Sequence, residues 1–242
     1  MKVMIVTGGG RGIGAATARL AAAEGYAVAV NYVRDRDAAE RLAREIGGLA
    51  VQADVAVEED VVRLFAEVDR SLGKVSALVN NAGVVDRGTR VEGMTGVRIA
   101  RMFAINVTGS FLCAREAIRR MSTRHGGSGG SIVNVSSIAA KLGGSGEYVD
   151  YAASKGAIDT FTVGLAREVG AEGIRVNAVR PGIIRTEIHV ASGDPARVDR
   201  IGAAAPLGRA GDPEEVARLI VWLASDEASY MSGALVDVSG GR

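Results

Sequence analysis

Short apolar runs alternate along the whole chain with longer stretches that have helical spacing. The apolar runs predict buried strands at residues 3–6, 27–31, 49–53, 75–79, 132–135, 174–179 and 234–238. Amphipathic stretches between them predict helices at residues 15–24, 37–46, 58–72, 97–120 and 213–223, and a further helix contains Tyr151. Strict alternation of strands and helices is typical of a doubly wound parallel sheet with right-handed crossovers. We therefore expect one α/β domain over residues 1–242, with about seven parallel strands and helices on both faces.

Composition narrows the class of protein. The chain of 242 residues can bury one large core, and its 29 Lys and Arg against 28 Asp and Glu do not indicate nucleic acid or an anionic membrane as partner. The single Cys113 excludes an internal disulfide framework, which fits a reducing cytosol. No apolar run approaches the ~20 residues of a membrane helix, and Lys2 leads directly into the first strand. We expect a cytoplasmic protein, and no metal site because His125 and His189 lack ligand spacing.

The segment Thr7–Gly14 separates the first predicted strand from the first helix and is rich in glycine. Glycine permits a tight turn and close approach of the backbone to a ligand, and free N–H groups at a helix start can bind phosphate. The generic dinucleotide pattern fits only loosely, through Gly10, Gly12 and Ala15. We expect a pyrophosphate-binding turn, against the alternative of a flexible surface turn.

The end of the second predicted strand bears on the choice of cofactor. An acidic residue there would bind the ribose 2′-hydroxyl of NAD, but this chain has Asn31 and no acid before Asp35. The guanidinium groups of Arg34 and Arg11 could instead flank a 2′-phosphate. We expect NADP(H) to be preferred and NAD(H) to remain possible. The alternative is that both arginines are ordinary solvated surface residues.

Tyr151 and Lys155 lie one turn apart on one face of a predicted helix, because an α-helix has about 3.6 residues per turn. A nearby ammonium favours the phenolate and lowers the pKa of a tyrosine, which makes Tyr151 a candidate proton donor and acceptor. Tyr148 cannot form such a pair, since the residue four positions on is Ala152. Taken alone, the pair is also consistent with an ordinary amphipathic helix.

Other polar residues stand where strands end or where a helix is interrupted. Functional loops of a doubly wound sheet lie at the carboxyl ends of its strands, where we place Asp54, Asn81, Gly83, Ser136 and Ser137. Asn106 within the predicted helix 97–120 indicates either a kink with freed backbone groups or a polar residue at an exposed turn. Residues 187–205 lack strong periodicity, which favours a mobile substrate lid.

In combination, these motifs resemble the short-chain dehydrogenase/reductase family over essentially the whole chain. The motifs that carry the resemblance stand in the family's order: Thr7-Gly8-x-x-x-Gly12-Ile13-Gly14, Asn80-Asn81-Ala82-Gly83, Asn106, Ser137, Tyr151-x-x-x-Lys155 and Pro181-Gly182. The resemblance implies a Rossmann-type fold and an oxidoreductase that transfers hydride between a nicotinamide and a carbonyl or secondary alcohol.

The resemblance also implies a catalytic tetrad of Asn106, Ser137, Tyr151 and Lys155. Ser137 would hold the substrate oxygen, Tyr151 would transfer the proton, Lys155 would lower the pKa of Tyr151, and Asn106 would anchor a relay water. The family alignment favours Ser137 over Ser136. Together with Arg11, Asn31 and Arg34, the expected cofactor contacts are Gly8, Gly12, Ile13, Gly14, Asp54, Val55, Asn81, Ala82, Gly83, Tyr151, Lys155, Pro181, Gly182, Ile184 and Thr186.

Within the family, the chain is similar to the 3-oxoacyl-carrier-protein reductase and glucose-dehydrogenase-like branches, which leaves a carrier-bound acyl group or a sugar as alternative substrates. Arg124 matches an arginine that carrier-protein reductases present at the site entrance, but Glu172 stands where they tend to carry a second one, and its charge disfavours an acidic carrier. The resemblance implies a homotetramer. A non-catalytic NADP(H)-binding regulator is the other reading, although such proteins usually lose the Tyr or the Lys.

Overall fold

The computed structural model describes residues 2–187 and 196–242. They form one seven-stranded parallel sheet in the order β3-β2-β1-β4-β5-β6-β7, which confirms the predicted architecture. The strands are β1 (Lys2–Val6), β2 (Tyr26–Tyr32), β3 (Leu49–Gln52), β4 (Ala77–Asn80), β5 (Gly130–Val135), β6 (Ile174–Pro181) and β7 (Leu235–Val238). The strand order reverses between β1 and β4, and doubly wound sheets bind ligands at such a switch point.

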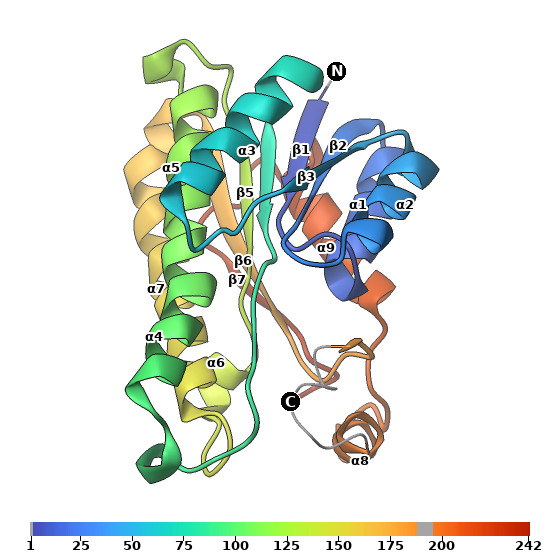
Figure 1. Cartoon of the computed structure of the whole chain (residues 1–242), viewed down its shortest axis with the longest axis vertical. Coiled ribbons are helices and arrows are strands. Elements are labelled where there is room, and N and C mark those ends of the chain that lie inside the picture. Colours follow the sequence, from blue (N-terminus) through green and yellow to red (C-terminus); the bar gives the residue numbers. More distant parts are fainter. Residues whose placement is uncertain (1, 188–195) are drawn as a thin grey trace.

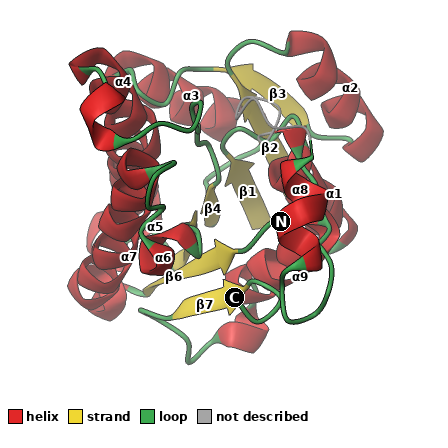
Figure 2. Cartoon of the chain, turned by 90° about the horizontal axis from the view of Figure 1, so that it is seen from below, coloured by secondary structure: helices red, strands yellow, loops and turns green. Residues whose placement is uncertain are grey.

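Helices cover both faces of the sheet, and the sheet runs between the two helical layers (Figures 1 and 2). One layer consists of α1 (Gly12–Ala23), α2 (Arg36–Ile46) and α9 (Pro213–Ala224), and the other of α3 (Glu58–Ser71), α5 (Gly109–Met121) and α7 (Val149–Val169). Three shorter helices, α4 (Gly96–Phe103), α6 (Ala139–Leu142) and α8 (Arg197–Ala203), lie toward the end of the molecule at which the strands finish.

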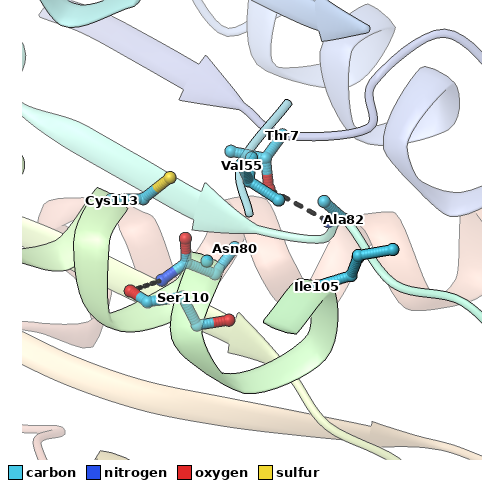
Figure 3. A pocket seen from close by; sticks show the side chains of 8 residues that line it. Thr7, Val55, Asn80, Ala82, Ile105, Ser110 and Cys113 are labelled. Carbon is cyan, nitrogen blue, oxygen red and sulfur yellow. Dashed lines mark hydrogen bonds between the residues drawn. The ribbon is translucent and has the colours of Figure 1, made fainter. Parts of the chain in front are cut away.

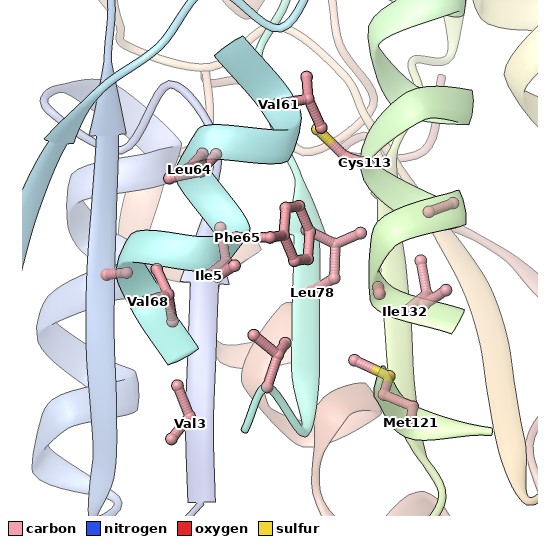
Figure 4. Close-up of a cluster of buried hydrophobic side chains, with 14 of the residues drawn as sticks. Val3, Ile5, Val61, Leu64, Phe65, Val68, Leu78, Cys113, Met121 and Ile132 are labelled. Carbon is pink, nitrogen blue, oxygen red and sulfur yellow. The ribbon is translucent and has the colours of Figure 1, made fainter. Parts of the chain in front are cut away.

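Each face of the sheet has its own hydrophobic core. Between the sheet and the α3–α5–α7 layer, Phe65 is fully buried among Ile5, Leu78 and Ile132 (Figure 4). On the other face, the strands pack against α1, α2 and α9 through a second cluster that includes Met4. Because both faces of the strands are buried, their sequences read as continuous apolar runs, which is the pattern that identified them.

Element boundaries differ from the predicted ones where backbone contacts decide them. Helix α1 begins at Gly12, three residues before the apolar pattern becomes regular, and Arg11 precedes it in extended conformation. Strand β6 continues to Pro181, because Arg180 and Pro181 pair with Asp237 and Val238 of β7.

The long helix predicted at residues 97–120 is interrupted where Asn106 lies. Helices α4 and α5 are joined by a π-helical turn, Ala104–Thr108, which confirms the predicted irregularity. Asn106 is only 1% exposed, so the alternative of an exposed polar turn is wrong.

The whole segment Gly96–Met121 is long and apolar enough to cross a membrane by length and composition, contrary to the expectation that no such stretch exists. Cys113, Ala114 and Ala117 of this segment pack into the core beside α3, although only 33% of its most apolar window is buried.

The expected lid at residues 187–205 is only partly visible. Its last part contains the short helix α8, whereas residues 188–195, which include His189, lie outside the described residues. Arg197 of α8 pairs with Glu147 (Nη1–Oε2 2.7 Å) and its guanidinium lies over the Tyr148 ring, 4.8 Å from the centroid. Helix α8 is therefore docked against the segment that leads into α7.

Candidate active site

The glycine turn after β1 is fastened to the end of β4. The Thr7 hydroxyl accepts hydrogen bonds from the backbone N–H groups of Asn81 and Ala82, both at 3.0 Å. In return, the Asn81 side chain donates to the carbonyl oxygens of Thr7 (2.8 Å) and Gly8 (3.1 Å). Thr7 and Ala82 are seen together with Val55 in Figure 3. The crevice that they line has no room for a water molecule, so it forms a packed floor and not a substrate site.

Three glycines in this turn occupy positions that a larger residue would not fit. Gly8 and Gly12 have φ of 59° and 53°, in the left-handed region that favours glycine. A Cβ atom on Gly14 would lie 2.6 Å from Asn81 Nδ2 and 2.7 Å from Gly8 O. A Cβ atom on Gly12 would lie 3.1 Å from Thr186 Cγ2, so Thr186, one of the expected cofactor contacts, adjoins the glycine turn.

The start of α1 fits a pyrophosphate group. Arg11 precedes the helix without a side-chain hydrogen bond that caps it, and no acidic residue lies in the first turn. The N–H groups at the start of a helix have no partner within the helix and carry its positive dipole end. Gly12, Ile13 and Gly14 thus present uncapped N–H groups at the switch point, which is the arrangement that a dinucleotide requires.

The structure corrects the role of Asn31. Its side chain was expected to face the cofactor, but the residue is 1% exposed. Asn31 Oδ1 accepts from Gly8 N (3.2 Å), and Nδ2 donates to Ala53 O (2.9 Å). The amide therefore joins the glycine turn to the end of β3, because a buried amide must satisfy its own hydrogen bonds. Asn31 holds the glycine turn in place through these two hydrogen bonds, and its side chain is not available to a phosphate.

Arg11 and Arg34 lie at the same corner of the molecule. A Cβ atom on Gly10 would lie 3.7 Å from the backbone N of Ala39, so the glycine turn rests on the first turns of α2. Arg34 lies in the loop that leads into α2. Both arginines are exposed, and in residues 2–187 and 196–242 neither guanidinium forms an ion pair. The corner therefore carries two guanidinium groups that form no ion pair among the described residues, with the Glu187 carboxylate near the start of α1 (Oε2 3.7 Å from a Cβ atom on Gly12).

Tyr151 and Lys155 face the carboxyl end of the sheet from α7. Lys155 is 4% exposed, and its Nζ atom donates to Val135 O at the end of β5 (2.8 Å). The same atom lies 5.7 Å from the centroid of the Tyr151 ring. Helix α7 starts directly before this pair, and Asp150 fixes the start by accepting from Arg98 Nε (2.7 Å) and Tyr151 N (2.9 Å).

The pKa values in the protein differ from the simple expectation. Burial raises the pKa of Tyr151, and a hydrogen bond with the Ser137 side chain partly opposes this. Burial likewise lowers the pKa of Lys155 to about 8, against the opposing charge of Asp159. The pKa of Tyr151 in the protein without ligands is therefore raised and not lowered, contrary to the expectation, because desolvation is the largest cause.

The two candidate serines have different partners. Ser136 is 2% exposed, and its hydroxyl donates to Lys155 O (3.1 Å). This hydroxyl is therefore occupied by the backbone of α7. Ser137 makes the hydrogen bond with Tyr151 and accepts from Ala139 N (3.1 Å) at the start of α6. Of the two, only Ser137 is in contact with the tyrosine hydroxyl region.

Asn106 lies next to the lysine across a glycine. Its side chain bonds to both backbone groups of Val84, accepting from N (2.8 Å) and donating to O (3.0 Å), and also donates to Ser154 Oγ (3.1 Å). A Cβ atom on Gly83 would lie 3.5 Å from both Asn106 Oδ1 and Lys155 Nζ. The π-helical turn thus brings Asn106 close to Lys155, with Gly83 between the two side chains.

The remaining predicted cofactor residues lie around the same edge of the sheet, with different degrees of access. Asp54 Oδ1 accepts from Ala56 N (3.0 Å), and Val55 packs against Gly109. Gly182 approaches the backbone of Ser239, where a Cβ atom would lie 2.7 Å from Ser239 Cα. Ile184 is 4% exposed and belongs to the core beside α9, so its side chain faces away from the open edge.

Sequence reasoning overlooked several residues that shape this site. Thr7 was seen only as part of a motif, although its hydroxyl organises both loops. Ser154 and Asp159 carry no signal in the sequence, because their hydrogen-bond and ion-pair partners Asn106 and Arg180 lie far from them along the chain. A polar residue between an apolar strand and a glycine turn, as at Thr7, is a signal that could have been used. In the described part of the chain, no group of three or more His, Cys, Asp or Glu side chains could hold a metal ion.

Known proteins resemble this chain over its full length. A protein-family model described as Enoyl-(Acyl carrier protein) reductase matches residues 8–242. "Uncharacterized oxidoreductase YgfF" of Escherichia coli (strain K12) is 55% identical, with all of both chains covered. A "Glucose and ribitol dehydrogenase homolog" of Oryza sativa subsp. japonica is 41% identical, covering 99% of this chain and 85% of the relative. A human "3-oxoacyl-[acyl-carrier-protein] reductase" is 40% identical, covering 99% and 97%.

The similarity to these relatives and the structure of the chain indicate the same family. The seven-stranded sheet, the glycine turn at its switch point and the Tyr151–Lys155 pair on α7 occur together in one molecule. The chain therefore belongs to the short-chain dehydrogenase/reductase family, whose members are oxidoreductases that use a nicotinamide cofactor.

Proposed function

We propose that the protein is an NADP(H)-dependent oxidoreductase that interconverts a small carbonyl compound and the corresponding secondary alcohol. The observation that carries the proposal is the Tyr151–Lys155 pair on α7, whose lysine Nζ is fixed at the end of β5 by Val135 O, directly before Ser136 and Ser137. The uncapped start of α1 and the close-packed glycine turn would hold the pyrophosphate, and Thr186 and Lys155 would lie toward the nicotinamide end.

Each residue has a role that follows from its position. Hydride transfer to or from carbon is the chemistry that a bound nicotinamide supplies. The Ser137 hydroxyl would hold the substrate oxygen against Tyr151, whose hydroxyl gives up or accepts the proton. Lys155, as an ammonium, would stabilise the phenolate left on Tyr151 once substrate and cofactor exclude water. Asn106 lies next to Lys155, where a relay water would connect the lysine with solvent.

Incubating the protein with NADPH and a panel of carbonyl compounds tests this function. The panel should include 3-oxoacyl thioesters and reducing sugars, because relatives carry the names of reductases and sugar dehydrogenases. We expect oxidation of NADPH with at least one carbonyl compound. A regulator would bind NADPH and oxidise none, and the presence of both Tyr151 and Lys155 argues against that alternative.

The first prediction concerns the choice of cofactor. A 2′-phosphate carries about two negative charges, and the exposed corner at Arg11 and Arg34 would attract it. We expect kcat/KM with NADPH to exceed that with NADH at least tenfold, which requires only ~1.4 kcal/mol. Arg11→Ala and Arg34→Ala should each reduce the ratio. Arg41→Ala is the matched control, since Arg41 is also exposed but lies further along α2.

Equal efficiency with both cofactors in the wild type would contradict NADP(H) preference. An unchanged ratio in both arginine variants would show that neither guanidinium contacts the phosphate, even if the preference itself is observed.

The substrate is proposed to be a free small molecule, and not an acyl group on an acidic carrier protein. Arg124 is 76% exposed at its side chain but pairs with Glu172 (Nη1–Oε1 3.1 Å). Glu172 also accepts from Ser122 Oγ (2.5 Å), so its carboxylate is fixed beside the arginine. The pair offsets the positive charge that an acidic carrier would need, which supports a small carbonyl compound as substrate. A cytoplasmic location is proposed only on the single Cys113, which leaves no internal disulfide to form.

The second prediction concerns assembly. On α5 and α7, Phe111 is 48% exposed and stacks on Phe161 with ring centroids 3.8 Å apart. Within residues 2–187 and 196–242, strand β7 is last in the sheet order and has one unpaired edge, and its apolar Leu235 and Val236 are only partly buried. Both surfaces support a homotetramer. Light scattering at micromolar concentration should give a tetramer mass, and a monomer mass would contradict the proposal.

A further inference from the structure

Alternating charges extend from the candidate catalytic lysine to the surface. Asp159 follows Lys155 by one turn of α7, and its Oδ2 lies 3.0 Å from Arg180 Nε. Arg180 Nη1 lies 3.3 Å from Asp237 Oδ1, and Asp237 Oδ2 accepts from Lys141 Nζ (2.5 Å). The order of charges from inside to outside is therefore positive, negative, positive, negative, positive. It joins α7, β6, β7 and α6.

In this row of charged side chains, the two residues nearest Lys155 are largely buried. The side chain of Arg180 is 9% exposed and that of Asp159 is 15% exposed, whereas Asp237 is 31% and Lys141 52% exposed. The Nε–H of Arg180 does not point along the line to Asp159, so the contact is an ion pair and not a hydrogen bond. Among the described residues, Asp159 Oδ1 is buried and has no hydrogen-bond partner. Its negative charge is thus only partly offset by Arg180.

Asp159 is the charged residue one turn beyond Lys155 on the same face of α7, although the two side chains do not form an ion pair. The other groups that surround Lys155 Nζ are the Tyr151 ring on the same helix, the Val135 carbonyl of β5, and the uncharged Asn106 and Gly83. The Asp159 carboxylate raises the pKa of Lys155, in opposition to the burial that lowers it to about 8. Arg180, on β6, contacts Asp159 and carries the same charge as Lys155, so its loss would favour the charged lysine with or without Asp159.

We propose that the Asp159–Arg180 pair is a positioning element of the active site, in which Asp159 keeps Lys155 charged and Arg180 limits how strongly it does so. In catalysis this matters only if the proposed function holds, because a neutral Lys155 could not stabilise a phenolate on Tyr151. The effect on the lysine itself does not depend on that function.

An ion pair that only stabilises the fold and an ion pair that tunes the charge of Lys155 predict different effects of substitution. Breaking a buried pair at either end destabilises the fold in the same direction. An ion pair that tunes the charge of Lys155 predicts opposite effects of its two ends on the lysine. Asp159→Asn removes the negative charge and lowers the pKa of Lys155, whereas Arg180→Gln leaves the Asp159 charge without its partner and raises the pKa of Lys155. The opposite signs are the test.

The lysine can be titrated directly, because the chain has only four lysines, at positions 2, 74, 141 and 155. NMR of protein labelled with ¹³C at lysine Cε follows each ammonium through its titration, and Lys155→Arg assigns the signal. We expect Asp159→Asn to lower the pKa of Lys155 by at least about half a pH unit and Arg180→Gln to raise it, since an opposite charge nearby commonly shifts a pKa by about 1–3. Asp159→Glu should restore the wild-type value within about half of that shift.

Asp69→Asn is the matched control. Asp69 pairs with the partly buried Arg120 (Oδ2–Nε 2.7 Å) and, like Asp159, has one buried oxygen without a partner. It lies on α3, and its loss should leave the Lys155 titration unchanged. If Arg180→Gln does not fold, the double variant Asp159→Asn/Arg180→Gln replaces it, with a Lys155 pKa above that of Asp159→Asn alone.

Two results would overturn the proposal: shifts of the same sign in Asp159→Asn and Arg180→Gln, or no shift in Asp159→Asn. If the double variant has a Lys155 pKa equal to or below that of Asp159→Asn, the proposed role of Arg180 is wrong. The alkaline limb of the pH profile of kcat should move with the NMR titration. If the Lys155 titration shifts as expected but no carbonyl compound is turned over, the proposed function is wrong, whereas the effect of the Asp159–Arg180 pair on the charge of Lys155 is supported.

Discussion

Tyr151→Phe is expected to reduce kcat/KM for carbonyl reduction by at least about a hundredfold, the usual contribution of a positioned acid or base. NADPH affinity should change little, because the hydroxyl is needed for the proton and the ring is retained. The hydroxyl is also the group that contacts Ser137, so its removal leaves the substrate oxygen without a proton donor. Steady-state kinetics and fluorescence titration with NADPH measure the two effects separately.

The control for this substitution is Tyr148→Phe. Tyr148 is 8% exposed and lies three residues before Tyr151. The substitution therefore removes the same chemical group, a buried tyrosine hydroxyl, from the same region. It has no lysine one turn further on, and it packs under Arg197. Tyr148→Phe should keep most of the activity. Retention of a tenth of wild-type kcat/KM by Tyr151→Phe, a loss of only ~1.4 kcal/mol, would exclude Tyr151 as the acid.

Gly14→Ala is expected to have the largest effect on folding and on cofactor binding together. The added methyl group would lie within 3 Å of Asn81 Nδ2, Gly8 O and Gly9 Cα, and two of these three atoms belong to the backbone. Overpacking of this kind typically costs about 1–3 kcal/mol of the free energy of unfolding. It would also separate the glycine turn from Asn81, which fixes the turn through Thr7 O and Gly8 O.

Calorimetry and NADPH titration measure these two consequences of Gly14→Ala. We expect a lower Tm and loss of detectable NADPH binding in the protein that still folds. Gly96→Ala is the control, because a Cβ atom at the first position of α4 meets no atom within 4 Å. A wild-type Tm and wild-type affinity in Gly14→Ala would contradict the close packing of the turn on β4.

The pattern of apolar residues predicted the parallel sheet, because strands buried on both faces leave continuous apolar runs and the helices between them keep one polar side. It predicted boundaries less well. The start of α1 at Gly12 depends on a turn that is held by Thr7 and Asn81, and such long-range contacts leave no periodic signal.

The candidate site was predicted unevenly for a similar reason. Residue type and spacing were enough for Tyr151 and Lys155, because a helix places them on one face. They were not enough for Asn31, whose position at the end of β2 suggests a cofactor contact until its bonds to Gly8 and Ala53 are seen. The sign of the effect on the pKa of Tyr151 also depends on burial, which the sequence alone does not give.

The central claim is that this site transfers hydride between a nicotinamide and a carbonyl carbon with Tyr151 as the acid. The most direct measurement is the fate of deuterium from NADPH labelled at C4 on the transferred side, with the best carbonyl compound of the panel as substrate. The account predicts an alcohol that carries one deuterium on the former carbonyl carbon, formed by the wild type and not detectably by Tyr151→Phe. NADPH that binds without deuterium transfer to any carbonyl compound, or equal transfer by both proteins, would contradict it.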